Sequence, residues 1–148
     1  MPTTGRRATR PASSGMLARR IALLALFEDE FQPGHAAAAL ERLAAEKDLS
    51  DEVRAHAASI VEGVTEHRDD LDARIGAEAP LIPVAELGRV ERTILRSALY
   101  EVLYSAATPS GETMRDAVSL ARIYAGDAAR RLVNGVLGSV SRSPGGGA

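Results

Sequence analysis

The sequence contains no cysteine and no tryptophan, and aromatic residues make up only 3% of its 148 positions. Without cysteine, disulfides and thiolate-bound metal sites are excluded. With so few aromatic residues, Leu, Val, Ile and Ala have to fill the core, a composition that favours closely packed helices over a sheet. No apolar run reaches the roughly 18 residues of a membrane span, and no signal-like stretch follows the first arginines. We therefore expect a cytoplasmic protein with no membrane partner.

Motifs that carry catalysis or bind cofactors are also missing from the sequence. The three histidines form no i, i+4 pair, and no phosphate-binding glycine loop or serine nucleophile motif occurs. The segment from Glu66 to Asp70 contains one histidine and three acids, which are interpreted as a solvated helix end rather than a metal site. The sequence therefore predicts a protein that is not an enzyme, with no cofactor and no metal.

Charge is distributed unevenly along the chain. Its net charge is −2, yet five of the 18 basic residues precede Glu28, the first acidic one, and leave 13 basic against 20 acidic residues in the remainder. A basic N-terminal segment on an acidic body favours a polyanionic partner, nucleic acid more than membrane. The guanidinium group of arginine binds phosphates and stacks on unpaired bases. The basic segment is therefore interpreted either as an RNA-binding element or as a feature that only promotes solubility.

The strongest structural pattern runs from Glu86 to Tyr104. Apolar residues recur there at steps of three and four, which places a continuous apolar stripe on one side of a helix. Pro83 and Pro109 mark where the chain leaves the helix. A helix this apolar needs other helices around it, so we predict that it is the central element of a bundle. Arg89, Arg92 and Arg96 step along another face and are expected to stay in solvent.

Further helical patterns flank this stretch, and the fold class is therefore all-α, a bundle of about six to seven helices. They cover residues 16 to about 32, about 35–48, 51 to about 66, a segment through Leu71 and Ile75 that ends near Gly76, a segment from Met114 to Tyr124 that ends before Gly126, and about 127–140. Ser13, Ser14 and Ser50 are candidate N-caps. Residues 1–15 are predicted to be a disordered arginine-rich arm, residues 16–142 a single helical domain, and residues 143–148 a flexible tail.

Three residues call for a specific interpretation. Phe27 and Phe31, spaced i, i+4, could form a stacking platform, but Phe31 is expected in the core and Phe27 is left open. Gly135 follows Asn134 inside an apolar helical pattern, so we expect a helix rather than a hairpin there. Its lack of a side chain is expected to let another helix approach closely, at a cost of about 1 kcal/mol relative to Ala.

Several segments together resemble the NusB family of bacterial transcription antitermination factors. Residues 86–104 are similar to the family's L-x-x-V-E-R-x-I-L-R-x-A-L-Y-E-L, and residues 132–137 to its F-V-N-G-V-L. Residues 18–27 resemble its A-R-x-x-A-x-x-A-L-Y/F helix, and residues 116–121 its N-E-A-V-E-L-A segment. The order and spacing hold over roughly residues 18–140.

The resemblance implies a fold of two small helical subdomains and a non-catalytic role in ribosomal RNA transcription. Its implied partners are boxA-type single-stranded RNA, the ribosomal protein that doubles as NusE, and the RNA polymerase antitermination complex. The implied RNA-binding residues are Arg6, Arg7, Arg10, Arg19, Arg20, Phe27 and Glu91. The implied partner-binding residues are Glu91, Arg115 and Asp116.

The sequence departs from the family pattern in three places. Arg115 stands where the family has an asparagine, Ser110 follows the proline in place of a bulky residue, and Pro11 to Gly15 separate the first arginines from the helix. Two other functions remain open. One is a protein-only helical adaptor or homodimer. The other is a detached NusB-like domain of a ribosomal RNA methyltransferase, which a chain ending at Ala148 without a βαβ pattern disfavours.

Overall fold

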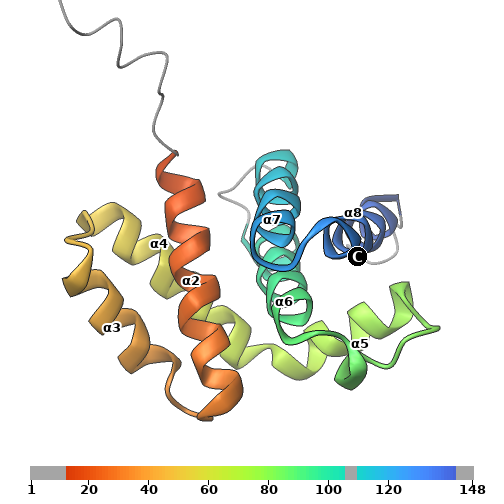
Figure 1. Cartoon of the computed structure of the whole chain (residues 1–148), viewed down its shortest axis with the longest axis horizontal. Helices are drawn as coiled ribbons and strands as arrows, with labels where there is room; N and C mark the ends of the chain where they lie inside the picture. Colours follow the sequence, from red (N-terminus) through yellow and green to blue (C-terminus); the bar gives the residue numbers. More distant parts are fainter. Residues whose placement is uncertain (1–12, 106–109, 143–148) are drawn as a thin grey trace, which may run out of the picture.

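The computed structural model describes residues 13–105 and 110–142, and these residues form α-helices, one short 3-10 helix and no strand (Figure 1). This confirms the all-α prediction. The elements, in chain order, are α2 (Ser14–Phe31), α3 (Ala36–Glu46), α4 (Asp51–Glu66), α5 (Arg68–Glu78), η1 (Val84–Glu86), α6 (Arg89–Tyr104), α7 (Ser110–Ala125) and α8 (Asp127–Arg142). The predicted arm falls mostly outside the described residues, and the predicted tail falls wholly outside them.

The helices begin and end where the local chemistry requires. The Ser13 side chain accepts a hydrogen bond from the Met16 amide at 3.1 Å, and Ser50 accepts one from the Val53 amide at 3.2 Å. Both serines therefore cap the first turn of a helix, as predicted. Gly126 has φ +96°, a conformation that glycine adopts without strain, and it separates α7 from α8.

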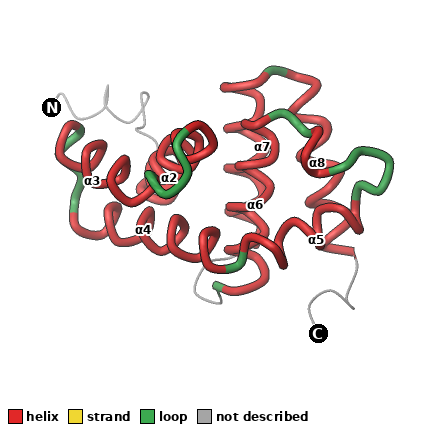
Figure 2. Tube along the Cα trace, turned by 90° about the horizontal axis from the view of Figure 1, so that it is seen from below, coloured by secondary structure: helices red, strands yellow, loops and turns green. Residues whose placement is uncertain are grey.

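The helices pack in two neighbouring groups. Figures 1 and 2 show α2, α3 and α4 side by side, with α6, α7 and α8 beside them and α5 passing below α6 and α8. Helix α6 contacts α2, α4, α5, α7 and α8, which confirms that it is the central element. Its buried stripe includes Ile94, Leu95, Ala98 and Leu99. The helix begins three residues later than predicted, because Leu87 and Gly88 are extended after the 3-10 turn.

Two expectations about side chains are wrong. Phe31 is 57% exposed rather than buried, because it occupies the last turn of α2, at the edge of the core, where the Arg89 side chain of α6 lies over its ring. Gly135 is exposed and a Cβ added there would meet nothing within 4 Å, so none of the described helices approaches it closely. A sequence pattern shows which residues share a helix face but not how far along the helix its neighbours extend.

The close helix approach occurs instead at Gly63 on α4. A Cβ added there would overlap the ring of Tyr100 on α6. That ring also lies nearly parallel to the rings of Tyr104 and His67, and the His67 and Tyr104 centroids are 4.0 Å apart with an interplanar angle of 15°. Tyr100, Tyr104 and His67 are called the ring stack below. The stack closes the seam between α4 and α6.

Substituting the two glycines by alanine should therefore have opposite effects. Gly63→Ala forces the Tyr100 ring out of its position, and we expect the free energy of unfolding to fall by about 1–3 kcal/mol. Gly135→Ala enters open space inside a helix and is expected to raise it by about 0.5–1 kcal/mol. Urea unfolding of both variants measures the difference. Equal effects of the two substitutions would contradict the packing described here.

Candidate nucleic-acid and partner interface

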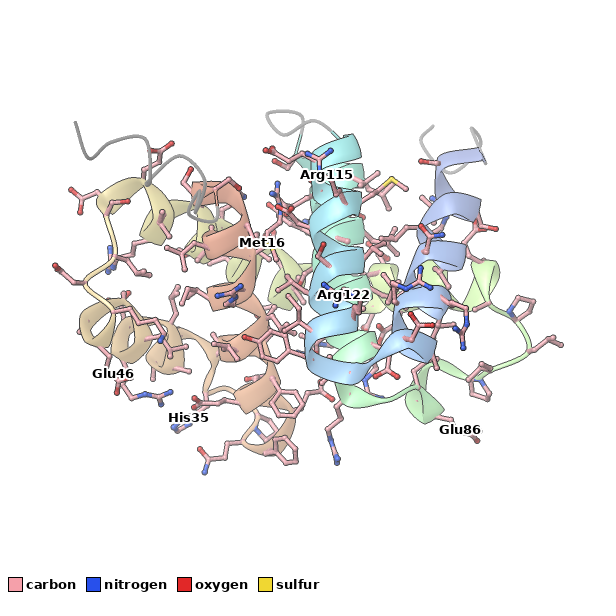
Figure 3. The ribbon with its side chains drawn as sticks, turned by 45° about the horizontal axis from the view of Figure 1, so that its top comes forward. Met16, His35, Glu46, Glu86, Arg115 and Arg122 are labelled. Atoms are coloured by element: carbon pink, nitrogen blue, oxygen red, sulfur yellow. The ribbon has the colours of Figure 1, made fainter. Side chains whose placement is uncertain are left out.

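The first turns of α2 and α7 lie at the same end of the molecule. Figure 1 shows both helices starting at the top, and Figure 3 shows Met16 and Arg115 near these two starts. The Arg115 side chain is exposed. Arg6, Arg7 and Arg10 lie outside the described residues, in the part of the chain that precedes Ser13. Any segment entering α2 therefore joins the body at the end that carries Arg115.

Arg19 is buried at this end, with 5% of its side chain exposed. Its Nε donates to Glu101 Oε1 at 2.7 Å and its Nη2 to Glu101 Oε2 at 3.2 Å. Its Nη1 donates to Asp116 Oδ2 at 2.7 Å, and Nη2 also reaches the Thr113 hydroxyl at 3.2 Å. One guanidinium thus joins α2 to α6 and α7.

His56 on α4 extends this group of buried polar side chains. Its Nε2 lies 2.9 Å from Glu101 Oε2, so the carboxylate is held from both sides. Burial alone would raise the pKa of Glu101, but hydrogen bonds with His56 and Arg19 outweigh burial and lower that pKa. Burial likewise opposes the charge of Arg19, yet Glu101 and Asp116 raise its pKa. Arg19, His56, Glu101, Thr113 and Asp116 are called the Arg19 cluster below.

Arg20 is placed differently from its neighbour. It is partly buried, and its Nε has no hydrogen-bond partner among the residues that the structure describes. The sequence groups Arg19 and Arg20 as adjacent members of one basic segment. Consecutive residues of a helix point in different directions, so the two side chains are available for different contacts.

A second surface lies where α2 ends and α6 begins. The Phe27 and Phe31 rings meet edge to face with centroids 5.2 Å apart, and the Arg89 guanidinium carbon lies 4.6 Å above the Phe31 ring. Phe27 and Glu91 are partly buried, whereas Phe31 and Arg89 are exposed. The Glu91 carboxylate folds over Gly88, where a Cβ would collide with it. Phe27, Phe31 and Arg89 are called the Phe31 surface below.

Of the three arginines expected to stay in solvent, Arg89 alone does so. Arg96 donates to Asp72 at 2.7 and 2.9 Å and to Glu30 at 3.0 Å, and Arg92 pairs with Glu30 as well. Arg96 is 7% exposed. Burial disfavours both charges, but the ion pairs outweigh it, lowering the pKa of Glu30 and raising that of Arg96. These arginines tie α6 to α2 and α5.

The described residues offer exposed cations for binding anionic groups. Within residues 13–105 and 110–142, no group of three or more His, Cys, Asp or Glu side chains is placed to hold a metal ion. No helix in the same ranges is long and apolar enough to cross a membrane. The exposed cations include Arg115 and Arg122 on α7 (Figure 3) and also Arg89 on α6. Such guanidinium groups can bind phosphates or carboxylates.

Sequence reasoning did not identify the contacts that hold these sites together. Glu101 and His56 are separated by 45 residues, and Arg19 and Glu101 by 82. No local spacing predicts such a pairing. The available signal was the position of Glu101 and Arg19, which are charged residues inside otherwise apolar helical stripes. A charge on a buried helix face requires a partner of opposite charge, so these positions indicate a buried ion pair without showing which residues form it. The Arg89–Phe31 contact had no comparable signal.

Comparisons with known proteins agree on one family. The model of the NusB family matches residues 16–142. A transcription antitermination protein NusB of Dehalococcoides mccartyi is 32% identical over 126 residues, covering 85% of this chain and 88% of the relative. The protein of the same name from Herpetosiphon aurantiacus is 36% identical over 129 residues, with the same coverage of 85% and 88%.

Solved structures share the fold of this chain. Antitermination factor NusB, in a crystal structure of NusB and NusE in complex with double-stranded RNA, superimposes with a TM-score of 0.79 at 25% identity, over 86% of this chain and 95% of that one. NusB of T. maritima superimposes with a TM-score of 0.81 at 23% identity, over 90% and 94%.

Proposed function

The chain belongs to the NusB family, and from this premise we propose that it is a non-catalytic transcription antitermination factor that binds boxA-type single-stranded RNA together with NusE during ribosomal RNA transcription. It would act in the cytoplasm, as part of the RNA polymerase antitermination complex. The observation that carries the proposal is the similarity over most of both chains to proteins named for antitermination. The similar NusB that was solved with NusE and RNA supports both partners.

The RNA-binding part of the proposal lies at the end where α2 and α7 begin. Arg6, Arg7 and Arg10 precede α2, and exposed Arg115 lies near the start of α7 (Figure 3). Arg20 is the further member of this set on α2. Phosphate contacts from several arginines give affinity that depends on salt, whereas base contacts give sequence preference. The end of the molecule where α2 and α7 begin thus supplies the electrostatic attraction for RNA.

The Phe31 surface is proposed as the partner-binding part. An exposed aromatic ring under a guanidinium combines the apolar anchor and the polar rim of a protein interface. Glu91 can accept hydrogen bonds from partner groups or base edges but would repel phosphates. A base could also stack on the exposed ring of Phe31, so the same surface can lie beside bound RNA.

Phe31→Ala should weaken NusE binding about tenfold or more, because it removes an aromatic anchor and the platform under Arg89. Ile123→Ala is the matched control, since Ile123 is 51% exposed on α7 and has a similar apolar character. Calorimetric titration of NusE into each variant measures the effect. Unchanged affinity in Phe31→Ala would remove this surface from the partner interface.

Fluorescence anisotropy of a labelled boxA-type RNA tests the function itself. The full chain is titrated with and without NusE, beside an RNA of the same length and scrambled sequence. We expect saturable binding that prefers the boxA-type RNA and tightens when NusE is present. Absence of RNA binding in both conditions would leave the family membership intact and favour a protein-only adaptor.

A further inference from the structure

Arg19 and Asp116 both belong to the set of residues expected to bind RNA or a partner, yet their side chains bind each other. We infer that the Arg19 cluster is a positioning device for RNA binding: it fixes the start of α2, where the basic segment enters, relative to the start of α7, which carries Arg115. This inference rests on the proposed RNA-binding function. It assigns to Arg19 an effect on RNA affinity without any contact with RNA.

Protein acceptors occupy four of the five N–H groups of Arg19. Its Nε, Nη1 and Nη2 all donate to protein acceptors on α6 and α7, at 2.7 to 3.2 Å. Gly15 lies close to the guanidinium, since a Cβ at that position would lie 2.9 Å from Nη1. To bind a phosphate, the side chain would have to abandon two buried carboxylates, which is strongly unfavourable.

The cluster is placed where it can set the angle between the two helices. Helix α2 has many contacts with α3, α4 and α6 but few with α7. The ion pair from Arg19 to Asp116 and the hydrogen bond to Thr113 bridge this sparse contact within the first two turns of α7. Glu101 holds the same guanidinium from α6 through two further hydrogen bonds. Movement of α7 relative to α2 would break these bonds first.

A positioning role and a direct effect of charge predict opposite changes in RNA affinity for Asp116→Asn. If only the local charge mattered, Asp116→Asn would remove a negative charge near RNA and strengthen binding. If the cluster positions α2 and α7, the same substitution weakens the bridge and lowers RNA affinity. We expect a loss of about tenfold, a size typical of energetic coupling between sites. Glu112→Gln is the matched control, because it removes the same charge from the first turn of α7 outside the cluster.

Salt dependence supplies a readout that a phosphate contact would change. Each phosphate contact to single-stranded RNA contributes about −0.7 to the slope of log K against log salt. Asp116→Asn and Arg19→Lys are both expected to lower affinity while leaving this slope unchanged. A lysine keeps the charge but cannot bridge Glu101 and Asp116 with a planar fork. Thr113→Val keeps both charges and nearly the same volume, and a smaller loss in the same direction is expected.

The experiment is anisotropy of boxA-type RNA with the full chain and these four variants, at several salt concentrations and at a temperature where circular dichroism shows each variant folded. Removal of residues 1–12 is combined with Asp116→Asn in a double-mutant cycle. If the cluster positions the basic segment, Asp116→Asn costs much less affinity once that segment is gone.

Three outcomes would overturn the inference. They are tighter binding by Asp116→Asn, near-wild-type binding by Arg19→Lys, and additive effects of Asp116→Asn and the deletion. Failure of the wild-type chain to bind RNA would instead reject the proposed function, so the two failures are distinguishable.

Discussion

Replacing Arg19 with methionine is expected to lower the free energy of unfolding at pH 7 by about 3–5 kcal/mol. Methionine fills a similar volume but cannot donate hydrogen bonds. Among the residues that the structure describes, Glu101, 2% exposed, keeps only His56 as a partner, and Asp116 loses its ion pair with Arg19. The expected loss is that of leaving buried carboxylates without their cation. Guanidinium chloride unfolding, monitored by far-ultraviolet circular dichroism, measures it.

The difference in unfolding free energy between the wild type and Arg19→Met should shrink as the pH falls. The folded-state pKa of Glu101 is lowered, so its contribution to wild-type stability is present above the unfolded-state pKa and is lost as the pH falls through the folded-state pKa. In the variant the same carboxylate is destabilising when ionised, and protonation relieves it. Wild type and variant should therefore converge as the pH falls from 7 through the acidic range. A constant difference would contradict the role assigned to Glu101.

Arg54→Met is the matched control for this prediction. Arg54 pairs with Glu41 at 2.7 Å, but the two side chains are 49% and 58% exposed. Water solvates the charges of an exposed ion pair in both the folded and the unfolded state, so the expected loss of unfolding free energy is at most about 1 kcal/mol. A loss as large as that of Arg19→Met would show that burial is not what makes the Arg19 cluster important.

Replacing Arg6, Arg7 and Arg10 together by alanine is expected to weaken binding of boxA-type RNA about 100-fold at low salt. If each arginine neutralises one phosphate, these three residues contribute about −2 to the slope of log K against log salt in the wild type. The triple variant is expected to lose this contribution to the slope. Anisotropy titrations at four or more salt concentrations give both the affinity and the slope.

A variant with three other arginines replaced controls for net charge. Arg42, Arg54 and Arg131 are exposed and paired with carboxylates on the body of the protein. Their replacement changes the net charge equally, but we expect little change in RNA affinity. Equal losses in the two triple variants would mean that overall charge, rather than the segment before α2, attracts the RNA.

The helices were predictable because their signals are local. The apolar stripe of residues 86–104, the serine caps at Ser13 and Ser50 and the break at Gly126 each depend on residues within a few positions of one another. Such signals survive in a single sequence. The exact start of α6 was missed by three residues, because Leu87 and Gly88 are extended and the helical period alone does not show this.

The candidate site was less predictable because its contacts are between helices. Arg19 and Arg96 each look like one more surface arginine until two distant acids are placed beside them. Phe31 shows the reverse case, since it is an apolar residue in phase with the core and is nevertheless 57% exposed. Family resemblance supplied names for functional residues, but it did not say which of them face solvent.

The ring stack also gives this chain an internal optical reporter. The sequence has no tryptophan and three tyrosines, of which Tyr100 and Tyr104 both lie in the stack. Tyrosines held face to face in a fixed chiral arrangement dominate near-ultraviolet dichroism and alter tyrosine emission. Because the stack spans the seam of α4 and α6, its spectrum reports whether the two groups of helices are docked. Association of the two groups can thus be followed without any introduced label.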